Sequence, residues 1–328
     1  MLLVNCRVMA SPRSFPNPLA GPYLERLAQL RKDAARLQAA LHDPATLFVP
    51  VWRAHSFVLR TSTAISAQFV TGLDHLGISL TAEPILLGEF RGQLCFAVEI
   101  PEAQEPALQS VAEFCDLRSI AGELVHDEAG LLAYARAMVL WRERHRFCGR
   151  CGRPTQSIQG GHVLQCIDPA CAHQQFPRID PAVIVLITHG EQVLLGRQSA
   201  WPAGRYSTIA GFVEPGESLE DAVAREVYEE TGVRVDSVQY HSSQPWPFPS
   251  SLMLGFTAHA SDMQTRQIDD ELEDVRWLTR AQIADGEVAL PNPVSISFRL
   301  IEDWYDAGAS VALCDEPAAR LWTGTAKG

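Results

Sequence analysis

Apolar residues recur at helical spacing in two segments of the first half of the chain. One segment runs from Tyr23 to Leu41 and the other from Asp127 to His145, and we expect an amphipathic helix in each. Between them, the apolar runs Ile85 to Phe90 and Leu94 to Ile100 flank the turn sequence Arg91-Gly92-Gln93 and predict a β-hairpin. We therefore predict an α/β domain over residues 1–146.

The strand signal is stronger after Pro181. Ala182 to Ile187 and Gln192 to Gly196 predict a second hairpin, and Tyr206 to Ala210 predicts a third strand. The pattern then predicts a helix over about 219–231, strands near 233–240 and 252–260, and a last helix near 294–305. Strands with interposed helices are typical of an α/β or α+β sandwich, which we place at residues 178–314, followed by a tail at 315–328.

The composition narrows the class of protein. The 328 residues include 27 Lys and Arg against 39 Asp and Glu, a formal net charge of −12, which argues against a surface that binds nucleic acid or anionic lipid as a whole. The longest strongly apolar stretch, Ala182 to Ile187, is far shorter than the roughly 18 residues of a membrane helix. The N-terminal residues do not resemble a secretory leader. We therefore expect a cytoplasmic protein that does not contact membranes.

Four cysteines form two close pairs. Two residues separate Cys148 from Cys151, and four separate Cys166 from Cys171; both separations are typical of structural zinc sites. Four thiolates around one Zn²⁺ leave no open position for a substrate, so we expect a role in folding rather than chemistry. Unrelated reduced thiols, or two disulfides in a secreted protein, are the alternatives. We assign the pairs to a zinc ribbon over residues 147–177.

Five arginines flank this cysteine cluster in an otherwise acidic protein: Arg142, Arg144, Arg146, Arg150 and Arg153, with only Glu143 opposing them. The simple interpretation is a solvated helix end. The alternative is a local anion site, which would suit a phosphate-bearing substrate or an RNA end.

A helix with three carboxylates on one face is the most informative segment. Ser218 is a suitable N-cap and Gly232 a suitable residue just beyond the C-terminus, and the helix between them places Glu226, Glu229 and Glu230 side by side. These carboxylates continue a stripe that is apolar two turns earlier, which argues against the alternative of a solvated acidic face. Inward-facing carboxylates repel one another unless a cation holds them, and oxygen ligands favour Mg²⁺ or Mn²⁺.

A proline-rich run, Ser243-Gln244-Pro245-Trp246-Pro247-Phe248-Pro249-Ser250-Ser251, follows ten residues later. Alternating prolines fix the backbone and are not tolerated in a central strand, so we predict a stiff loop that presents Trp246 and Phe248. Exposed aromatic side chains on a rigid loop suit stacking on a planar base. A loop packed over the core is the alternative.

The glutamate helix and the loop before it resemble a known hydrolase motif. The segment reads Gly211-x5-Glu217-x7-Arg225-Glu226-Val227-x-Glu229-Glu230-x-Gly232-Val233 and matches the Nudix box at every position. The proline-rich run is similar to the SQPWPFPxS signature of the NADH pyrophosphatase branch of the Nudix hydrolases, which also carries a zinc ribbon directly before the catalytic domain. Phe15 to Leu19 and His145 to Cys148 resemble stretches of that branch. The resemblance implies a Nudix α/β/α sandwich, a small zinc ribbon and an N-terminal α/β domain like a degenerate Nudix domain.

The resemblance also implies roles for individual residues. Arg225 and Glu217, which can pair across the start of the helix by their spacing, join Glu226, Glu229 and Glu230 as the catalytic set. The implied Mg²⁺ or Mn²⁺ ligands are Glu226, Glu230, the carbonyl oxygen of Ala210 and a later glutamate placed at Glu271. The implied substrate-binding residues are Gln244, Pro245, Trp246, Pro247, Phe248, Pro249, Ser250, Ser251, Phe176 and Ser297. The chain departs from the family at Gly161, where relatives have a glutamate, and at Phe176, where they have a tyrosine.

The implied activity is metal-dependent hydrolysis of the pyrophosphate of NAD(H) into nicotinamide mononucleotide and AMP. One structural Zn²⁺ per chain, catalytic Mg²⁺ or Mn²⁺ and a homodimer are implied with it, and Glu229 and Glu271 are the candidates for the general base. Three other functions stay open: removal of the NAD cap from RNA 5′ ends by the same site, hydrolysis of another dinucleotide such as ADP-ribose, and, from a different class, a zinc-ribbon regulator that binds nucleic acid.

Overall fold

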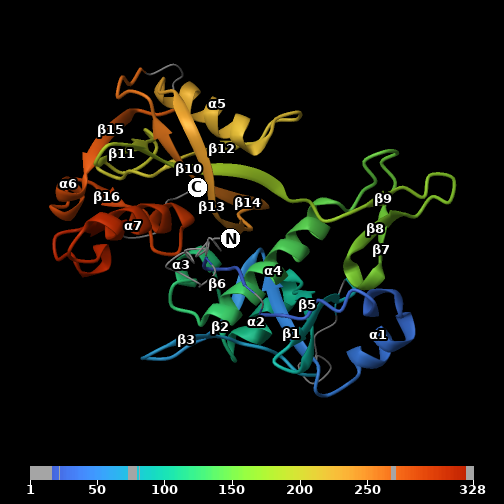
Figure 1. Cartoon of the computed structure of the whole chain (residues 1–328). Helices are drawn as coiled ribbons and strands as arrows, with labels where there is room; N and C mark the ends of the chain where they lie inside the picture. The colour runs from blue at the N-terminus through green and yellow to red at the C-terminus, as the bar shows by residue number, and fades with distance from the viewer. Residues whose placement is uncertain (1–16, 22, 73–79, 81, 267–270, 323–328) are drawn as a thin grey trace, which may run out of the picture.

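The structure, a computed structural model, describes residues 17–21, 23–72, 80, 82–266 and 271–322. The chain folds into two lobes with a small projection beside them (Figure 1). The N-terminal lobe holds one sheet, the C-terminal lobe holds a second sheet with helices on both faces, and the residues between the lobes form the projection. No helix in the described residues is long and apolar enough to cross a membrane.

The N-terminal lobe is a six-stranded sheet covered by one long helix. The strands lie in the order β3-β2-β1-β5-β4, with β6 paired to β2 and with β1 and β5 parallel. Helix α4 (His126–Arg144) packs Leu131, Ala135 and Met138 into the core on one face of this sheet. The other elements are β1 (Leu47–Trp52), β2 (His55–Arg60), β3 (Ile65–Ala67), β4 (Ile85–Phe90), β5 (Gln93–Glu99), β6 (Glu113–Cys115), η3 (Glu102–Gln104), α2 (Glu105–Gln109) and α3 (Leu117–Ile120).

The predictions for this lobe are confirmed in part. The hairpin is present as β4 and β5, and Arg91 and Gly92 both have the positive φ angles, 51° and 81°, that a two-residue hairpin turn requires. The helix expected over Asp127–His145 is also present as α4. The helix predicted from Tyr23 to Leu41 is wrong in its first half, where only the short turn η1 (Leu30–Lys32) precedes α1 (Ala34–Leu41).

The helix starts late because the backbone before it leaves the helical region. Leu27 has a φ of 45°, and Asp33 takes a non-helical conformation. The side chain of Asp33 accepts a hydrogen bond from the N–H of Arg36 at 3.0 Å and so caps α1 at this point. Apolar periodicity alone does not reveal such a break.

The projection is a small three-stranded sheet of β7 (Thr155–Ile158), β8 (Val163–Cys166) and β9 (Gln174–Gln175). Its turn η4 (Gln159–Gly161) lies against η1 of the N-terminal lobe. The projection is therefore packed on the N-terminal lobe rather than suspended between the lobes.

The C-terminal lobe is built on a second six-stranded sheet, ordered β13-β14-β10-β11-β15 with β12 paired to β10. Strand β10 (Asp180–His189) runs parallel to β14 (Ser251–Ala260) and antiparallel to β11 (Gln192–Arg197) and β12 (Ile209–Phe212). The other elements are β13 (Val235–Trp246), β15 (Asp274–Thr279), β16 (Ala289–Leu290), β17 (Arg320–Leu321), α5 (Leu219–Thr231), α6 (Arg280–Ala284), α7 (Ile296–Gly308) and η5 (Leu313–Asp315).

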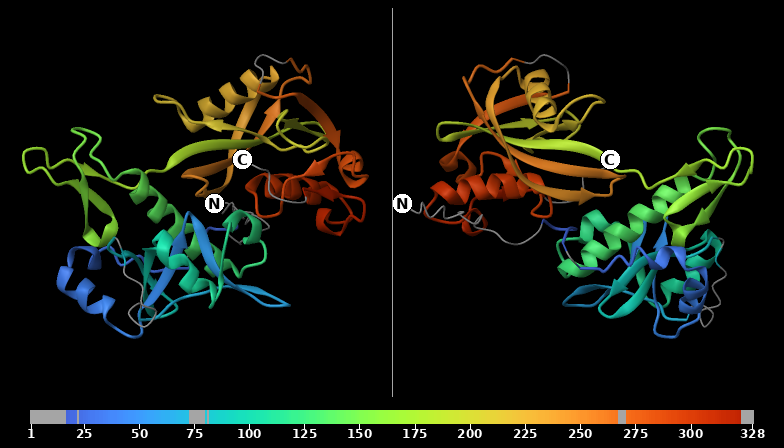
Figure 2. Two further views of the ribbon diagram at one scale, coloured as in Figure 1. Left: turned by 180° about the vertical axis from the view of Figure 1, so that it is seen from behind. Right: turned by 45° about the vertical axis from the view of Figure 1, so that its right-hand side comes forward.

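Alternation along β10 gives this lobe two cores. Val183, Val185 and Ile187 lie in the core that includes α5, whereas Ile184 and Leu186 lie in the core that includes α7. One of these helices therefore covers each face of the sheet (Figure 2). The lobe is an α/β/α sandwich, and the predicted fold class is confirmed.

Two predictions for this lobe need correction, and the first concerns its third strand. Strand β12 begins at Ile209 rather than at Tyr206. The backbone of Ser207 pairs with Gly196 of β11, and the N–H of Tyr206 donates to the carbonyl of Ala289. Tyr206 and Ser207 therefore form backbone hydrogen bonds with Ala289 and Gly196 and do not pair with β10.

The second correction concerns the proline-rich run, which is not a loop over its whole length. Residues 244–246 end β13 and pair with residues 251–253 of β14. The sheet order places β13 at an edge, where the missing N–H of Pro245 removes no bond to a further strand of the described sheet. Only residues 247–250 form the turn, in which the Phe248–Pro249 peptide is cis.

A short N-terminal segment ties the two lobes together. The amide nitrogen of Asn17 donates to the hydroxyl of Ser242 at 3.0 Å and to the carbonyl of Ser243 at 2.8 Å, both on β13. Its amide oxygen accepts a hydrogen bond from Arg299 of α7 at 2.8 Å. Leu19, two residues later, is buried in the core of the N-terminal lobe.

Candidate active site

Helix α5 has the two caps that its sequence predicts. The hydroxyl of Ser218 accepts from the N–H of Asp221 at 3.1 Å, and the carboxylate of Asp221 accepts from the N–H of Ser218 at 3.3 Å. At the other end Gly232 adopts a left-handed φ of 73°, and its N–H donates to the carbonyl of Tyr228. These local bonds fix both ends of the helix and hence the positions of its glutamates.

The carboxylate of Glu226 lies directly against the backbone of β12 at Gly211, and we call this contact the seat of Glu226. A Cβ atom at Gly211 would lie only 2.0 Å from the carboxyl carbon of Glu226, so no residue other than glycine fits there without moving that carboxylate. The side chain of Glu226 is 12% exposed. Burial raises its pKa, and the negative charges of Glu229 and Glu271 act in the same direction against the opposing effect of Arg225.

Arg225 holds the loop before the helix and one edge of the carboxylate cluster. Its guanidinium binds both oxygens of Glu217, at 2.5 and 3.0 Å, which is the pairing expected from their spacing. It also lies 2.9 Å from Glu226 and 3.0 Å from Glu229 and donates to the carbonyl of Phe212. Arg225 and the N–H of Glu214 lower the pKa of Glu217, so Glu217 is held as an anion.

The remaining candidate metal ligands differ in exposure and in the element that carries them. Glu230 is buried at 3% exposure, whereas the side chain of Glu229 is 49% exposed. Glu271 accepts from Gln198 at 3.4 Å and is close enough to Glu226 to raise its pKa. Ala210 precedes the seat on β12 and pairs with β10. All these donors are oxygen atoms, the ligands that hard divalent cations prefer.

The four cysteines of the projection converge on one point. Their sulfur atoms all lie within 4.8 Å of one another. The distances are 3.9 Å between Cys148 and Cys171 and 3.5 Å between Cys151 and Cys166. Tetrahedral zinc with bonds of about 2.3 Å separates its sulfur ligands by roughly 3.8 Å, so the arrangement fits one Zn²⁺. The four-residue gap is accommodated by a turn at Asp168, whose carbonyl accepts from the N–H of Cys171.

Gln244 is completely buried, and its amide is fully engaged by the protein. Its nitrogen donates to the carbonyls of Pro18 at 2.9 Å and Val294 at 2.7 Å. Its oxygen accepts from the N–H of Ile296 at 2.9 Å. This predicted substrate contact therefore lies where β13, the start of α7 and the N-terminal segment meet.

The aromatic residues of the proline-rich run are half-buried rather than exposed. Trp246 and Phe248 pack edge to face, with ring centroids 5.0 Å apart, against the core of the N-terminal lobe. The guanidinium groups of Arg136 and Arg118 lie 4.7 and 5.0 Å from the centre of the Phe248 ring. Arg136 also donates to the carbonyl of the buried Pro247. The expectation of freely exposed rings is wrong because the N-terminal lobe covers this turn.

The last predicted substrate contacts are scattered. Ser250 donates to Asp180 at 2.6 Å and ties the turn to the first residue of β10, while Pro249 is exposed and Ser251 begins β14. Ser297 is 1% exposed, and its hydroxyl accepts from the N–H of Thr208 at 3.1 Å.

The two positions that depart from the family lie on the projection. Gly161 has a φ of 88°, and a Cβ atom there would approach Ile85 to 2.8 Å, so the packing leaves no room for a glutamate. Phe176 is 63% exposed and offers its ring to solvent.

Three family models match successive parts of the chain. An NADH pyrophosphatase-like rudimentary NUDIX domain matches residues 45–141, an NADH pyrophosphatase zinc ribbon domain matches 143–176, and a NUDIX domain matches 178–297. The NAD-capped RNA hydrolase NudC of Stutzerimonas stutzeri (strain A1501) is 40% identical over 269 residues, which cover 81% of this chain and 93% of that protein. The chain belongs to the Nudix hydrolases. The zinc ribbon match and the converging cysteines together support a structural zinc site.

Other relatives of this Nudix hydrolase cover less of it. The human NAD-capped RNA hydrolase NUDT12 is 38% identical over 243 residues, which cover 69% of this chain and 49% of the human protein. The chain thus matches about half of that longer relative. A solved NUDIX hydrolase from Nitrosomonas europaea is 22% identical with a TM-score of 0.42, covering 54% of this chain and 97% of that one.

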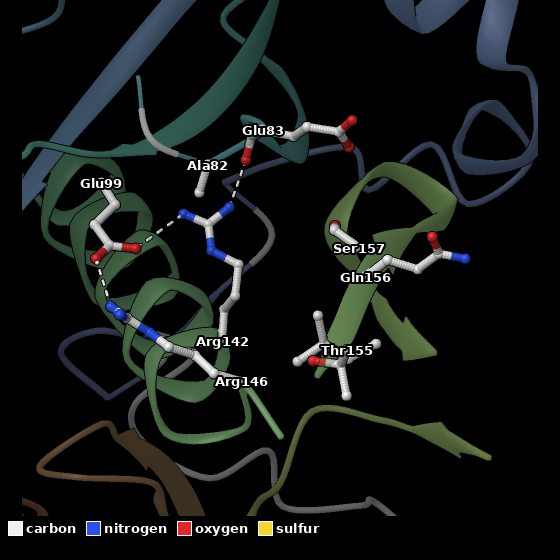
Figure 3. Close-up of a pocket in the computed structure, with 9 residues that line it drawn as sticks. Ala82, Glu83, Glu99, Arg142, Arg146, Thr155, Gln156 and Ser157 are labelled. Atoms are coloured by element: carbon white, nitrogen blue, oxygen red, sulfur yellow. Dashed lines mark hydrogen bonds and ion pairs between the residues drawn. The ribbon is translucent and has the colours of Figure 1, made fainter. Parts of the chain in front are cut away.

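The arginines beside the ribbon of this Nudix hydrolase are largely paired. Arg142 and Arg146 both lie 3.3 Å from Glu99, and Arg142 donates to the carbonyl of Glu83 in a cavity of about 480 Å³ (Figure 3). Arg153 lies 4.0 Å from Asp168. Arg144 and Arg150 are exposed. The pairing favours the structural interpretation of Arg142 and Arg146 over an anion site.

Two residues that position the site were not singled out from the sequence. Asn17 lies within the stretch Phe15–Leu19 that resembles the family, but nothing in that stretch indicates its partner strand. Arg136 offers a clearer signal, because it interrupts the apolar side of α4 between Leu132 and Val139 at helical spacing. A charged residue on a core-facing stripe indicates a specific partner beyond the helix.

Proposed function

We propose that this Nudix hydrolase cleaves the pyrophosphate of NAD(H) into nicotinamide mononucleotide and AMP. The observation that carries the proposal is the seat of Glu226 against Gly211, with Arg225 fixing the loop beside it. The matches of the other two domains to NADH pyrophosphatase models support this substrate class. So do the NudC and NUDT12 relatives, which are described as NAD-capped RNA hydrolases.

In this proposal Glu226 and Glu230 hold Mg²⁺ or Mn²⁺, with Glu229, Glu271 and the carbonyl of Ala210 as further donors. The donor set fits because it consists of oxygen atoms gathered where burial and like charge disfavour an uncompensated anion. A bound divalent cation supplies positive charge to the pyrophosphate oxygens and lowers the pKa of water.

The chain itself supplies orientation and a proton acceptor. Arg225 keeps Glu217 and the loop in place, so that the seat of Glu226 is formed before substrate binds. Glu229 is the most exposed carboxylate of the helix, and it and Glu271 are the candidates for accepting the proton of the attacking water. The turn at residues 247–250 is proposed to contact the substrate from the edge of the sheet.

A second substrate, RNA that carries NAD at its 5′ end, is favoured by the names of the relatives. The cap contains the same pyrophosphate as the free dinucleotide, so its cleavage requires no further catalytic group. The attached chain requires only a path away from the site.

We also propose a homodimer in the cytoplasm. Four large apolar residues on or beside the zinc ribbon, Phe147, Ile167, Phe176 and Ile179, are 49–64% exposed, and burial of such side chains favours association with a second copy. Free cysteines among the described residues favour a reducing compartment. Analytical ultracentrifugation of the full chain tests the dimer directly.

The function is tested by identifying the products formed from NADH with Mn²⁺ in ¹⁸O-labelled water. We expect AMP and reduced nicotinamide mononucleotide, one of them carrying the label. Glu230→Gln should lower turnover by orders of magnitude with the fold retained, whereas Glu220→Gln, at an exposed position of the same helix, should be neutral. Near-normal turnover by Glu230→Gln would refute the metal assignment, and a clear preference for ADP-ribose would refute the substrate.

A further inference from the structure

A cavity of about 380 Å³ lies where the two lobes and the zinc ribbon meet. Its lining includes Tyr134 and Trp141 of α4, Trp246 and Leu252 of β13 and β14, and His162 of the ribbon. The volume is that of a small-ligand site. None of the residues of the Nudix box lines it, so it is distinct from the carboxylate cluster.

The lining of this junction cavity has the opposite sign of charge to the chain as a whole. Arg26, Arg31 and Arg178 line it, and no acidic side chain is among the described residues of its wall. Arg178 is paired with Asp180 at 2.5 Å. In a chain of net charge −12, such a lining selects an anionic ligand.

Arg26 and Arg31 lie close together, because the guanidinium of Arg31 donates to the carbonyl of Arg26 at 3.4 Å. Arg26 lies over the ring of Tyr134, 4.3 Å from its centre. A guanidinium stacked in this way is held in orientation while its N–H groups remain in the plane for a phosphate. Burial, with the added positive charge of Arg31 and Arg26, lowers the pKa of His162 to about 4, so both arginines act electrostatically on another residue of the cavity lining.

The rest of the lining is aromatic and apolar. The aromatic residues of the lining are Tyr23, Tyr134, Trp141 and Trp246. A cationic edge combined with aromatic surface is the combination that binds single-stranded nucleic acid without reading its sequence, because every base has a face that can stack.

The cavity is close to the proposed catalytic seat. Gly211 pairs with Val183 of β10, and Val183 pairs with Leu254 of β14, two residues from Leu252 in the cavity wall. Two strand spacings of about 4.8 Å and two residues of about 3.3 Å along β14 give a separation of roughly 12 Å. One polynucleotide end can therefore reach both places.

The cationic surface beside the ribbon is a weaker candidate for the same ligand. There Arg142 and Arg146 share Glu99, and Glu83 lies on the same wall, so acids balance the arginines (Figure 3). The junction cavity differs from it in having arginines without acids in its described lining.

We propose that the junction cavity binds the first nucleotides of an RNA chain attached to the NAD substrate, with phosphate against Arg26 and Arg31 and a base against the aromatic wall. This inference rests on the proposed function and adds to it the path of the chain. It assigns to the N-terminal lobe, which carries Arg26 and Arg31, a role in selecting the capped polymer over the free dinucleotide.

The test compares wild type, Arg26→Gln/Arg31→Gln, and the control Arg144→Gln/Arg150→Gln, which removes the same charge from exposed positions near the ribbon. The kcat/KM of each is measured for NADH and for a short NAD-capped single-stranded RNA over a series of salt concentrations. For the cavity variant we expect kcat/KM on the RNA to fall on the order of tenfold. We also expect the slope of log kcat/KM against log salt concentration to become shallower by about 1.4, because two phosphate contacts are lost. The kcat/KM of the cavity variant for NADH should stay within twofold of wild type. The kcat/KM of the control variant should stay within twofold of wild type on both substrates.

Other outcomes separate this inference from the proposed function. An unchanged RNA rate in the cavity variant, an equal loss on both substrates, or a selective loss in the control would overturn the cavity assignment. If wild type cleaves NADH but not capped RNA, the cavity assignment is also overturned, while the proposed function stays intact. Failure of wild type on both would refute the function itself. If the double variant unfolds, as a thermal melt would reveal, Arg26→Gln alone, at an exposed position, gives the same comparison.

Discussion

Replacement of Gln244 by alanine should destabilise the C-terminal lobe rather than weaken substrate binding. The side chain is 0% exposed and makes three hydrogen bonds, to the carbonyls of Pro18 and Val294 and from the N–H of Ile296. These partners come from the N-terminal segment and from the start of α7. The amide therefore connects parts of the chain that its position in the family signature does not suggest.

The magnitude follows from the groups that would be left unpaired. Alanine removes the partner of one buried carbonyl, one partly buried carbonyl and one buried N–H, and each such loss costs about 1 kcal/mol. We expect a loss of about 3 kcal/mol in the free energy of unfolding of this lobe. Gln244→Glu should be at least as harmful, because it places a negative charge against the carbonyls of Pro18 and Val294.

The assay is urea unfolding followed by tryptophan fluorescence, together with the KM and kcat for NADH of the folded variants. Gln239→Ala is the matched control, because Gln239 lies on the same strand and is exposed. We expect a normal midpoint and normal kinetics for the control. For Gln244→Ala we expect a lowered midpoint, with KM changed less than twofold at temperatures where the protein is folded.

The reverse pattern of stability and kinetics would refute a purely structural role for Gln244. A Gln244→Ala variant of wild-type stability with a KM raised tenfold would mean that the amide leaves its protein partners to bind substrate. In that event the position would be a substrate contact, as the resemblance implies.

Two further predictions concern residues that hold the site in shape. Gly211→Ala should abolish turnover while circular dichroism stays unchanged, because the new methyl group displaces the carboxylate of Glu226; retained turnover would show that the seat is not needed. Arg136→Met should raise the KM for NADH several-fold, because the hydrogen bond that holds the carbonyl of Pro247 is lost. The free energy of unfolding should change little, because the substitution also removes a buried cation whose desolvation is costly. Arg118→Met, which alters the same aromatic contact from a more exposed position, is its kinetic control, and equal effects of the two would contradict a specific role for Arg136.

Features set by neighbouring residues were predictable from the sequence. The limits of α5 follow from Ser218 and Gly232, whose caps form within a few residues of the helix. The hairpin at Arg91 and Gly92 follows in the same way from its turn. The position of the carboxylates on one face of α5 also followed, because helical spacing is a local property.

Features set by distant residues were not predictable. Alternating prolines correctly exclude a central strand, but Pro245 lies in an edge strand, and the order of strands in a sheet depends on the whole fold. The half-burial of Trp246 and Phe248 depends on the N-terminal lobe. The engagement of Gln244 depends on Pro18, which is 226 residues away. In the same way, the proximity of Glu271 to Glu226 is visible only once α5 and the residues just before β15 are placed in the fold.

The attachment of Asn17 to β13 has a consequence for the order of events during protein synthesis. Asn17 emerges from the ribosome well before its partner Ser243, which lies 226 residues later in the chain. At about 5–20 residues per second, roughly 10–45 s pass before that strand exists. Arg299, which completes the same contact, comes later still. Asn17 can therefore reach its final place only after the C-terminal lobe has been synthesised.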